Sequence, residues 1–179
     1  MKPSGYILLF SLLLTQCKPK EDNTFSQFAG KPEIPASIKK EHEYLLDEIG
    51  RIALLEDSTG KAAVKLKKLM QHHFKEEEDY VLAPLGLLPS LIEGKIPAQS
   101  KAVIGLTDKL KAELNHMSAE HQLIKAYMDE LIQAAGKENH PEVNSLEKEI
   151  NKHAATEEEV FFPASILIGE FLKLKSNGQ

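Results

Sequence analysis

The chain has 179 residues, a net charge of -5 and 42% hydrophobic residues. This length allows one domain to bury most of its apolar surface without a disulfide or a metal ion as a staple. The small negative charge excludes the basic surface that binding to nucleic acid requires. Tryptophan is absent, aromatic residues make up 6%, and Leu, Ala, Lys and Glu dominate, which favours α-helix over β-sheet. We therefore expect an all-α protein without a nucleic-acid partner.

Residues 1–16 are typical of a signal peptide. Lys2 supplies a positive charge, and the apolar run 6–14 is too short to span a bilayer. Cys17 follows where a bacterial lipoprotein carries its lipid, so the segment resembles a lipobox. Gln16 departs from the small residue that is usual there, which leaves a simple signal peptide cleaved elsewhere as the alternative. We expect an exported protein, anchored in a membrane through Cys17 on the periplasmic or cell-surface side.

Residues 17–36 are polar and contain Pro32 and Pro35, with no periodic apolar pattern. This composition predicts a flexible tether, and ~20 such residues in polyproline geometry would reach about 60 Å. The folded domain is then expected over residues 37–175.

Four stretches of the folded domain have apolar residues at steps of three and four, the period of an amphipathic helix. Short connections join these stretches, and no alternating strand pattern occurs. The sequence therefore predicts an up-down-up-down four-helix bundle. The first predicted helix begins at the N-cap Ser37, and the second covers 61–83, up to Pro84. The third covers 100–135, before Gly136, with an interruption near Gly105 and Thr107. The fourth runs from 141 to a bend at Pro163 and is followed by a helical turn or two over 166–174.

Each apolar stripe carries one histidine, and two of these histidines are followed four residues later by a glutamate. Residues four apart lie on the same helix face, so both glutamates should point into the core. A buried carboxylate is costly unless it is paired or binds a metal, and neutral imidazoles do not supply the charge. The predicted metal ligands are His42, His73, Glu77, His121, His153 and Glu157.

Six ligands exceed the four of a closed zinc site, and two carboxylates can bridge adjacent ions, so we expect two metal ions. Mixed imidazole and carboxylate ligands suit iron, ahead of manganese and zinc. Open coordination positions would then accept dioxygen or a related small ligand.

The two glutamate motifs also form an internal repeat, HFKEEEDYVLAP from residue 73 and HAATEEEVFFP from residue 153. In these segments the chain resembles the hemerythrin-like, or HHE cation-binding, family, and the resemblance covers about residues 38–166. It implies a hemerythrin-like bundle in which His42 and His121 are the ligands of the first and third helices. Met117 stands where oxygen-carrying hemerythrins have a further histidine. The resemblance is therefore to a four-histidine, two-glutamate branch, and it argues against reversible oxygen carriage.

Neighbouring residues leave alternatives open. Glu158 competes with Glu157, and Glu76 and Glu78 compete with Glu77, although the apolar period favours the predicted ligands. Glu120 either orients a ligand imidazole or is a surface charge. The residues expected to be solvated are His72, His116 and His140, and those expected to fill the core are Met117 and Met128.

The leading functional hypothesis is a non-haem di-iron protein that binds a small ligand for sensing, storage or protection, and that is a binding protein rather than an enzyme. One alternative is a di-iron enzyme that removes peroxide or oxidises ferrous iron. Ferritin-like enzymes use Glu-x-x-His, the reverse order to the motifs in this chain. The other alternative is a lipoprotein with a structural metal or none. The sequence identifies no protein partner.

Overall fold

The computed structural model describes residues 30–177. The predicted signal peptide, Cys17 and most of the predicted tether lie outside these residues. The described part is helical and has no β-strand, so the all-α prediction is confirmed. None of its helices combines the length and apolar character needed to cross a membrane.

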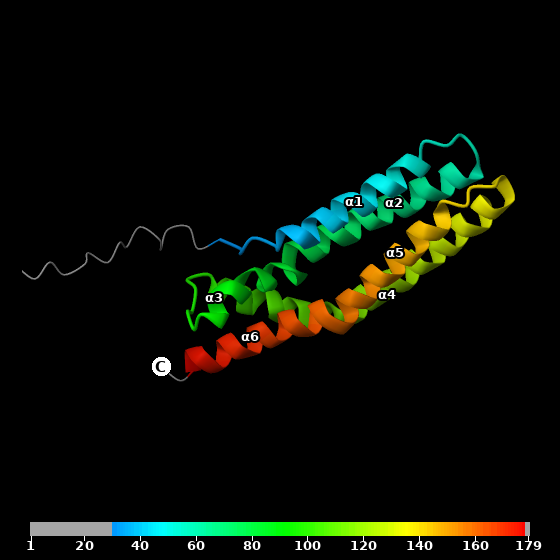
Figure 1. Cartoon of the computed structure of the whole chain (residues 1–179). Helices are drawn as coiled ribbons and strands as arrows, with labels where there is room; N and C mark the ends of the chain where they lie inside the picture. The colour runs from blue at the N-terminus through cyan, green and yellow to red at the C-terminus, as the bar shows by residue number, and fades with distance from the viewer. Residues whose placement is uncertain (1–29, 178–179) are drawn as a thin grey trace, which may run out of the picture.

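The helices form an elongated up-down-up-down bundle (Figure 1). α1 and α2 form one antiparallel pair, and α4 forms a second pair with α5, which continues through η4 into α6. At 1.5 Å per residue, α4 is about 58 Å long. The elements, in chain order, are α1 (Ala36–Ile52), α2 (Ser58–Glu76), the π-helical turn η2 (Glu77–Val81), the 3-10 helix η3 (Ala83–Leu87), α3 (Leu88–Ile92), α4 (Ser100–Glu138), α5 (Val143–Thr156), the π-helical turn η4 (Glu157–Phe161) and α6 (Phe162–Asn177).

α4 is longer than the sequence predicts. It runs through Gly105 and Thr107 without interruption and passes Gly136, which is therefore not the residue that ends it. The helix ends at Asn139, which has the left-handed conformation, with φ 62°. The extension places the Glu138 carboxylate at the start of α2, where it accepts hydrogen bonds from two backbone N–H groups at 3.0 and 2.8 Å. This cap ties the two helical pairs together at one end of the bundle.

The last helix is longer than the predicted turn or two over 166–174, because α6 follows η4 directly and runs for 16 residues without stopping at Pro163. The preceding π turn provides the reason. The Phe162 backbone N–H donates to the Glu157 carbonyl, five residues earlier, and Pro163 then falls in the first turn of α6. Pro163 has no N–H to donate, and it directly follows this widened bond, where the regular bonding to the residue four earlier is already interrupted.

Two smaller predictions about helix ends also differ from the structure. Ser37 is not the N-cap of α1, which begins at Ala36 without a side-chain cap. The expected loop after Pro84 contains η3 and α3, and Pro84 lies in the first turn of η3. Ahead of α1, Pro32 is buried, and a Cβ atom on Gly86 would collide with the carbonyl oxygen of Glu33. The segment before α1 therefore packs closely against η3.

The core consists of two apolar clusters, one toward each end of the bundle. The first includes Leu45, Leu66 and Met128, and the second includes Val103 and Leu172. Between them lies a layer of buried histidines and glutamates.

Leu114 and Val160 continue the apolar period of their helices in the sequence, but they are not in this core: Leu114 is 37% exposed and Val160 is 53% exposed. Val160 lies inside η4, where the wider π turn shifts the inward face, so that Phe162 becomes the next buried residue after Glu157.

The tightly packed core makes a specific stability prediction. Leu66 is fully buried, and Leu66→Ala should lower the free energy of unfolding by about 2 to 5 kcal/mol through lost contacts and a new cavity. Leu54, 81% exposed, is the matched control, and Leu54→Ala should change it by less than about 0.5 kcal/mol. Chemical denaturation followed by circular dichroism measures both, and equal effects would contradict the assigned packing.

Candidate metal centre

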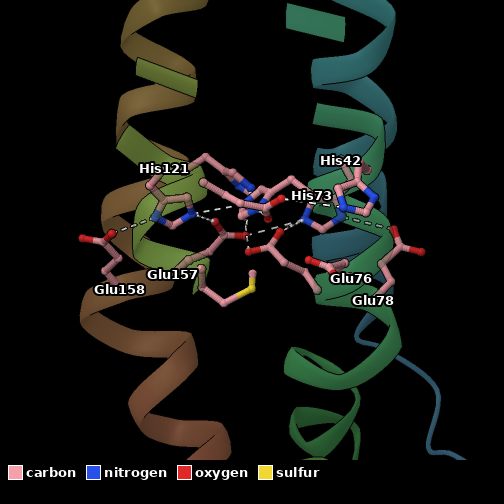
Figure 2. A network of polar contacts seen from close by, with 12 residues as sticks. His42, His73, Glu76, Glu78, His121, Glu157 and Glu158 are labelled. Atoms are coloured by element: carbon pink, nitrogen blue, oxygen red, sulfur yellow. Dashed lines mark hydrogen bonds and ion pairs between the residues drawn. The ribbon is translucent and has the colours of Figure 1, made fainter. Parts of the chain in front are cut away.

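The structure brings all six predicted ligands together in the polar layer between the two apolar clusters (Figure 2). α1 contributes His42, α4 contributes His121, and the two His-x-x-x-Glu motifs come from α2–η2 and α5–η4. None of the six residues is more than 7% exposed.

Glu77 lies between two pairs of histidines. Its Oε1 lies 3.3 Å from Nε2 of His73, and its Oε2 lies 3.6 Å from Nε2 of His42. We call the space beside His73 and His121 the His73 half-site, and the space beside His42 and His153 the His42 half-site. Glu77 therefore presents one oxygen to each half-site.

Glu157 mirrors this arrangement from the opposite helical pair. Its Oε2 lies 3.4 Å from Nε2 of His121, and its Oε1 lies 2.9 Å from Nε2 of His153. Each half-site thus contains two imidazoles and one oxygen from each carboxylate. Each half-site therefore has four donor atoms, and both carboxylates are shared between the two half-sites. This ligand set suits two adjacent ions.

Both glutamates start a π turn. The Leu82 N–H donates to the Glu77 carbonyl at 2.9 Å, and the Phe162 N–H donates to the Glu157 carbonyl. A π turn is rare and occurs mostly as a single widened turn at a functional site. Here the same backbone feature follows the same His-x-x-x-Glu motif twice.

The outward nitrogen of every imidazole faces a glutamate from outside the inner set. The Nδ1 atoms of the four histidines lie 2.7 to 3.5 Å from a carboxylate oxygen. Hydrogen bonds from His42, His73 and His121 fix the ring orientation and the tautomer, so that the other nitrogen is free to bind a metal, whereas Nδ1 of His153 lies near Glu41 without forming a hydrogen bond. The pairs are His42–Glu78, His73–Glu120, His121–Glu158 and His153–Glu41.

The two inward nitrogens of the His73 half-site face each other. When both rings are neutral and Nδ1 of each donates to its outer glutamate, Glu120 for His73 and Glu158 for His121, each Nε2 carries a lone pair. These two Nε2 atoms lie 3.0 Å apart. Two lone pairs at that distance repel each other unless a proton or a metal ion lies between them.

Buried polar atoms without hydrogen-bond partners around both carboxylates also indicate a site for cations. Among the described residues, no hydrogen-bond partner exists for either oxygen of Glu77 or Glu157, for Nε2 of His42, or for either nitrogen of His153. His153 and Glu157 are close, but not in hydrogen-bond geometry. An unsatisfied buried polar group costs about 1 to 3 kcal/mol. The residues present therefore fit a bound pair of cations.

The electrostatics of the two carboxylates are unequal. Burial and the neighbouring Glu157 carboxylate raise the pKa of Glu77 well above its ordinary value. Burial also raises the pKa of Glu157, but contacts with His121, His153 and His42 outweigh it and hold that pKa well below its ordinary range. The surrounding imidazoles therefore stabilise one carboxylate anion more than the other. A cation in each half-site would favour the ionised form of both.

The geometry also distinguishes the alternative carboxylates. Glu157 is fully buried at the centre, whereas the Glu158 side chain is 45% exposed and contacts the outward side of His121. The same contrast separates Glu77 from its neighbours, because the side chains of Glu76 and Glu78 are 26% and 31% exposed.

Glu120 orients His73, which was one of its two predicted roles. Sequence reasoning missed Glu41, Glu78 and Glu158 as outer partners. The doubled glutamates at 77–78 and 157–158 are the signal that could have found Glu78 and Glu158, since the first of each pair faces in and the second faces out.

Met117 is buried, and its Sδ accepts a hydrogen bond from the Tyr80 hydroxyl at 3.1 Å. The three histidines expected to be solvated lie outside the centre. The His72 side chain is 61% exposed, His116 contacts Glu76, and His140 binds Asp57 beside the α2 cap.

The family comparison agrees with this geometry. A family model described as the hemerythrin HHE cation binding domain matches residues 33–165, well over half of the chain. The chain belongs to the hemerythrin HHE family. Its HHE domain binds metal cations, and the buried histidine and glutamate groups supply the ligands for them. Searches of curated proteins and of solved structures returned no match.

The outer carboxylates give a testable prediction for the HHE domain. Glu158→Gln weakens the acceptor for Nδ1–H of His121 and should lower metal affinity about 10- to 100-fold. Glu159, exposed and one residue away, provides the control variant Glu159→Gln, for which we expect no change. Competition with a chromophoric chelator measures both affinities. Equal affinities in the two variants would show that Glu158 does not support its histidine.

Proposed function

We propose that this HHE domain binds two iron ions and, through them, dioxygen or a related small ligand, as a binding protein for sensing, storage or protection. The observation that carries the proposal is the sharing of Glu77 and Glu157, each with one oxygen in each half-site. A single ion could use only half of this ligand set.

The donor chemistry favours iron. Each half-site offers two imidazole nitrogens and two carboxylate oxygens, a mixture of borderline and hard donors. Four protein ligands per ion leave positions free for a small molecule on an ion that prefers six. Bound iron supplies redox activity and affinity for small oxygen- or nitrogen-containing ligands.

The chain itself shields and orients the centre. The ring of Phe74 stacks on His42 with centroids 3.9 Å apart and an interplanar angle of 3°. Phe162 covers His121 with centroids 5.9 Å apart. These apolar faces exclude bulk water from both half-sites, and low polarity strengthens each electrostatic contact within them.

An apolar surface groove lies next to the His73 half-site. It has a volume of about 380 Å³, and Phe162 forms part of its wall while also packing against His121. A groove of this character suits the approach of a small, weakly polar molecule such as dioxygen. The other lining residues are Leu114, Ser118, Glu158, Pro163 and Ile166.

The iron content tests the proposal. Protein purified after growth with iron should hold about two iron ions per chain and absorb in the near ultraviolet and visible range after exposure to air. Glu77→Gln removes a charged oxygen from both half-sites and should reduce the iron content to about one ion or less. Metal analysis and optical spectroscopy measure this.

The matched control is Glu43→Gln, an exposed glutamate beside His42, which should leave both readouts unchanged. Circular dichroism of Glu77→Gln establishes that the variant is folded. A colourless, iron-free wild-type protein after iron loading would overturn the proposal.

We also propose that the protein is exported and held at a membrane by a lipid on Cys17, which the segment 1–17 supports by its charge, its apolar run and its single cysteine. In cells fed labelled palmitate, the wild-type chain should carry label and sediment with membranes. Cys17→Ala should lose the label and the sedimentation. Gln16→Ala, which places a small residue before the cysteine, should keep both. A wild-type chain without label would reject the lipid anchor.

A further inference from the structure

A second group of metal-ligating side chains lies on the solvent side of the centre, where α2 and α4 meet. We call His72, Glu76, His116 and Glu120 the surface cluster. The side chains of His72 and His116 are 61% and 43% exposed, that of Glu76 is 26% exposed, and that of Glu120 is 9% exposed. A solvated cation could therefore reach the two imidazoles directly.

The spacing within the surface cluster matches that of the buried centre. His72 and Glu76 are four residues apart on α2, and His116 and Glu120 are four apart on α4. Each pair therefore lies on one helix face. Because the two faces meet at the α2–α4 contact, two imidazoles and two carboxylates converge.

The distances suit one ion. Oε1 of Glu120 lies 3.8 Å from Nε2 of His72 and 3.8 Å from Nε2 of His116. Oε2 of Glu76 lies 2.9 Å from Nε2 of His116. Nitrogen and oxygen ligands that each lie about 2.0 to 2.2 Å from a zinc ion are separated from one another by about 3 to 4 Å. Ligand atoms of His72, Glu76 and Glu120 all lie within 4.8 Å of one another.

The surface cluster also lacks other positive charge. Within residues 30–177, no lysine or arginine forms an ion pair with Glu76 or Glu120. Glu120 uses Oε2 to accept from His73 at 2.8 Å, while its Oε1 lies beyond hydrogen-bond distance of His72 and His116. This leaves one oxygen of a nearly buried carboxylate directed at two imidazoles.

We propose that the surface cluster binds one divalent transition-metal ion, in addition to the two ions of the buried centre. His72, Glu76 and Glu120 supply three ligand atoms within reach of one ion, a set that Zn²⁺ accepts, and His116 lies beside Glu76 and Glu120. Glu120 connects the two sites, because its other oxygen holds the ligand His73.

Zinc uptake tests this site. In equilibrium dialysis of the metal-free full chain against Zn²⁺, the wild type should bind about three ions and the double variant His72→Ala, His116→Ala about two. The matched control exchanges the exposed neighbours, Gln71→Ala and Asn115→Ala, and should bind as the wild type does. Equal uptake by the histidine variant and the wild type at every free zinc concentration would overturn the proposal.

Imidazole NMR separates this site from the buried centre. In ¹⁵N-labelled wild-type protein, the ring nitrogen signals of His72 and His116 should shift during the zinc titration. Unmoved signals of His72 and His116 at saturating zinc would overturn the surface site. If these signals shift while iron never enters the protein, only the proposed function fails, so the two failures are distinguishable.

Discussion

The burial of two carboxylates at one level of a helical bundle is the constraint on which the rest of this structure depends. Glu77 and Glu157 are fully buried, with their four oxygens lacking hydrogen-bond partners among the described residues. An ion taken out of water loses several kcal/mol of solvation, which uncharged neighbours do not restore. The inward imidazoles and the cations that the HHE domain binds stabilise these two buried charges, and the outer glutamates lie behind the imidazoles.

The residues of the centre form concentric layers. Two carboxylates lie innermost, four imidazoles surround them, and outer glutamates orient the imidazoles. Above and below this polar layer, the two apolar clusters close the bundle. Because three of the four rings are hydrogen-bonded from outside, the direction of their inner nitrogens is set before any ion arrives. Rigid helices and fixed rings together favour a defined site over a flexible one.

Much of this arrangement could be predicted from residue spacing, because a helix repeats every 3.6 residues and the inward positions follow from it. His42, Glu77 and Glu157 are all buried where the apolar stripes place them. The π turns could not be predicted, since an i to i+5 bond leaves no mark in the apolar period before the turn. The same shift exposes Val160. The end of α4 depends on a contact between Glu138 and a helix 79 residues away in sequence, which local propensity does not contain.

Each π turn changes the helical phase of the segment that follows it: η2 lies between α2 and η3, and η4 lies between α5 and α6. Upstream of Glu77 and Glu157 the inward face follows one register, and downstream it follows another, displaced by the extra residue in each turn. Removing the extra residue from η4 would give a regular helix from α5 into α6 and would turn the buried face that begins at Phe162 toward solvent. The π turn therefore lets Glu157 face the metal centre and Phe162 face the core within one continuous helical segment.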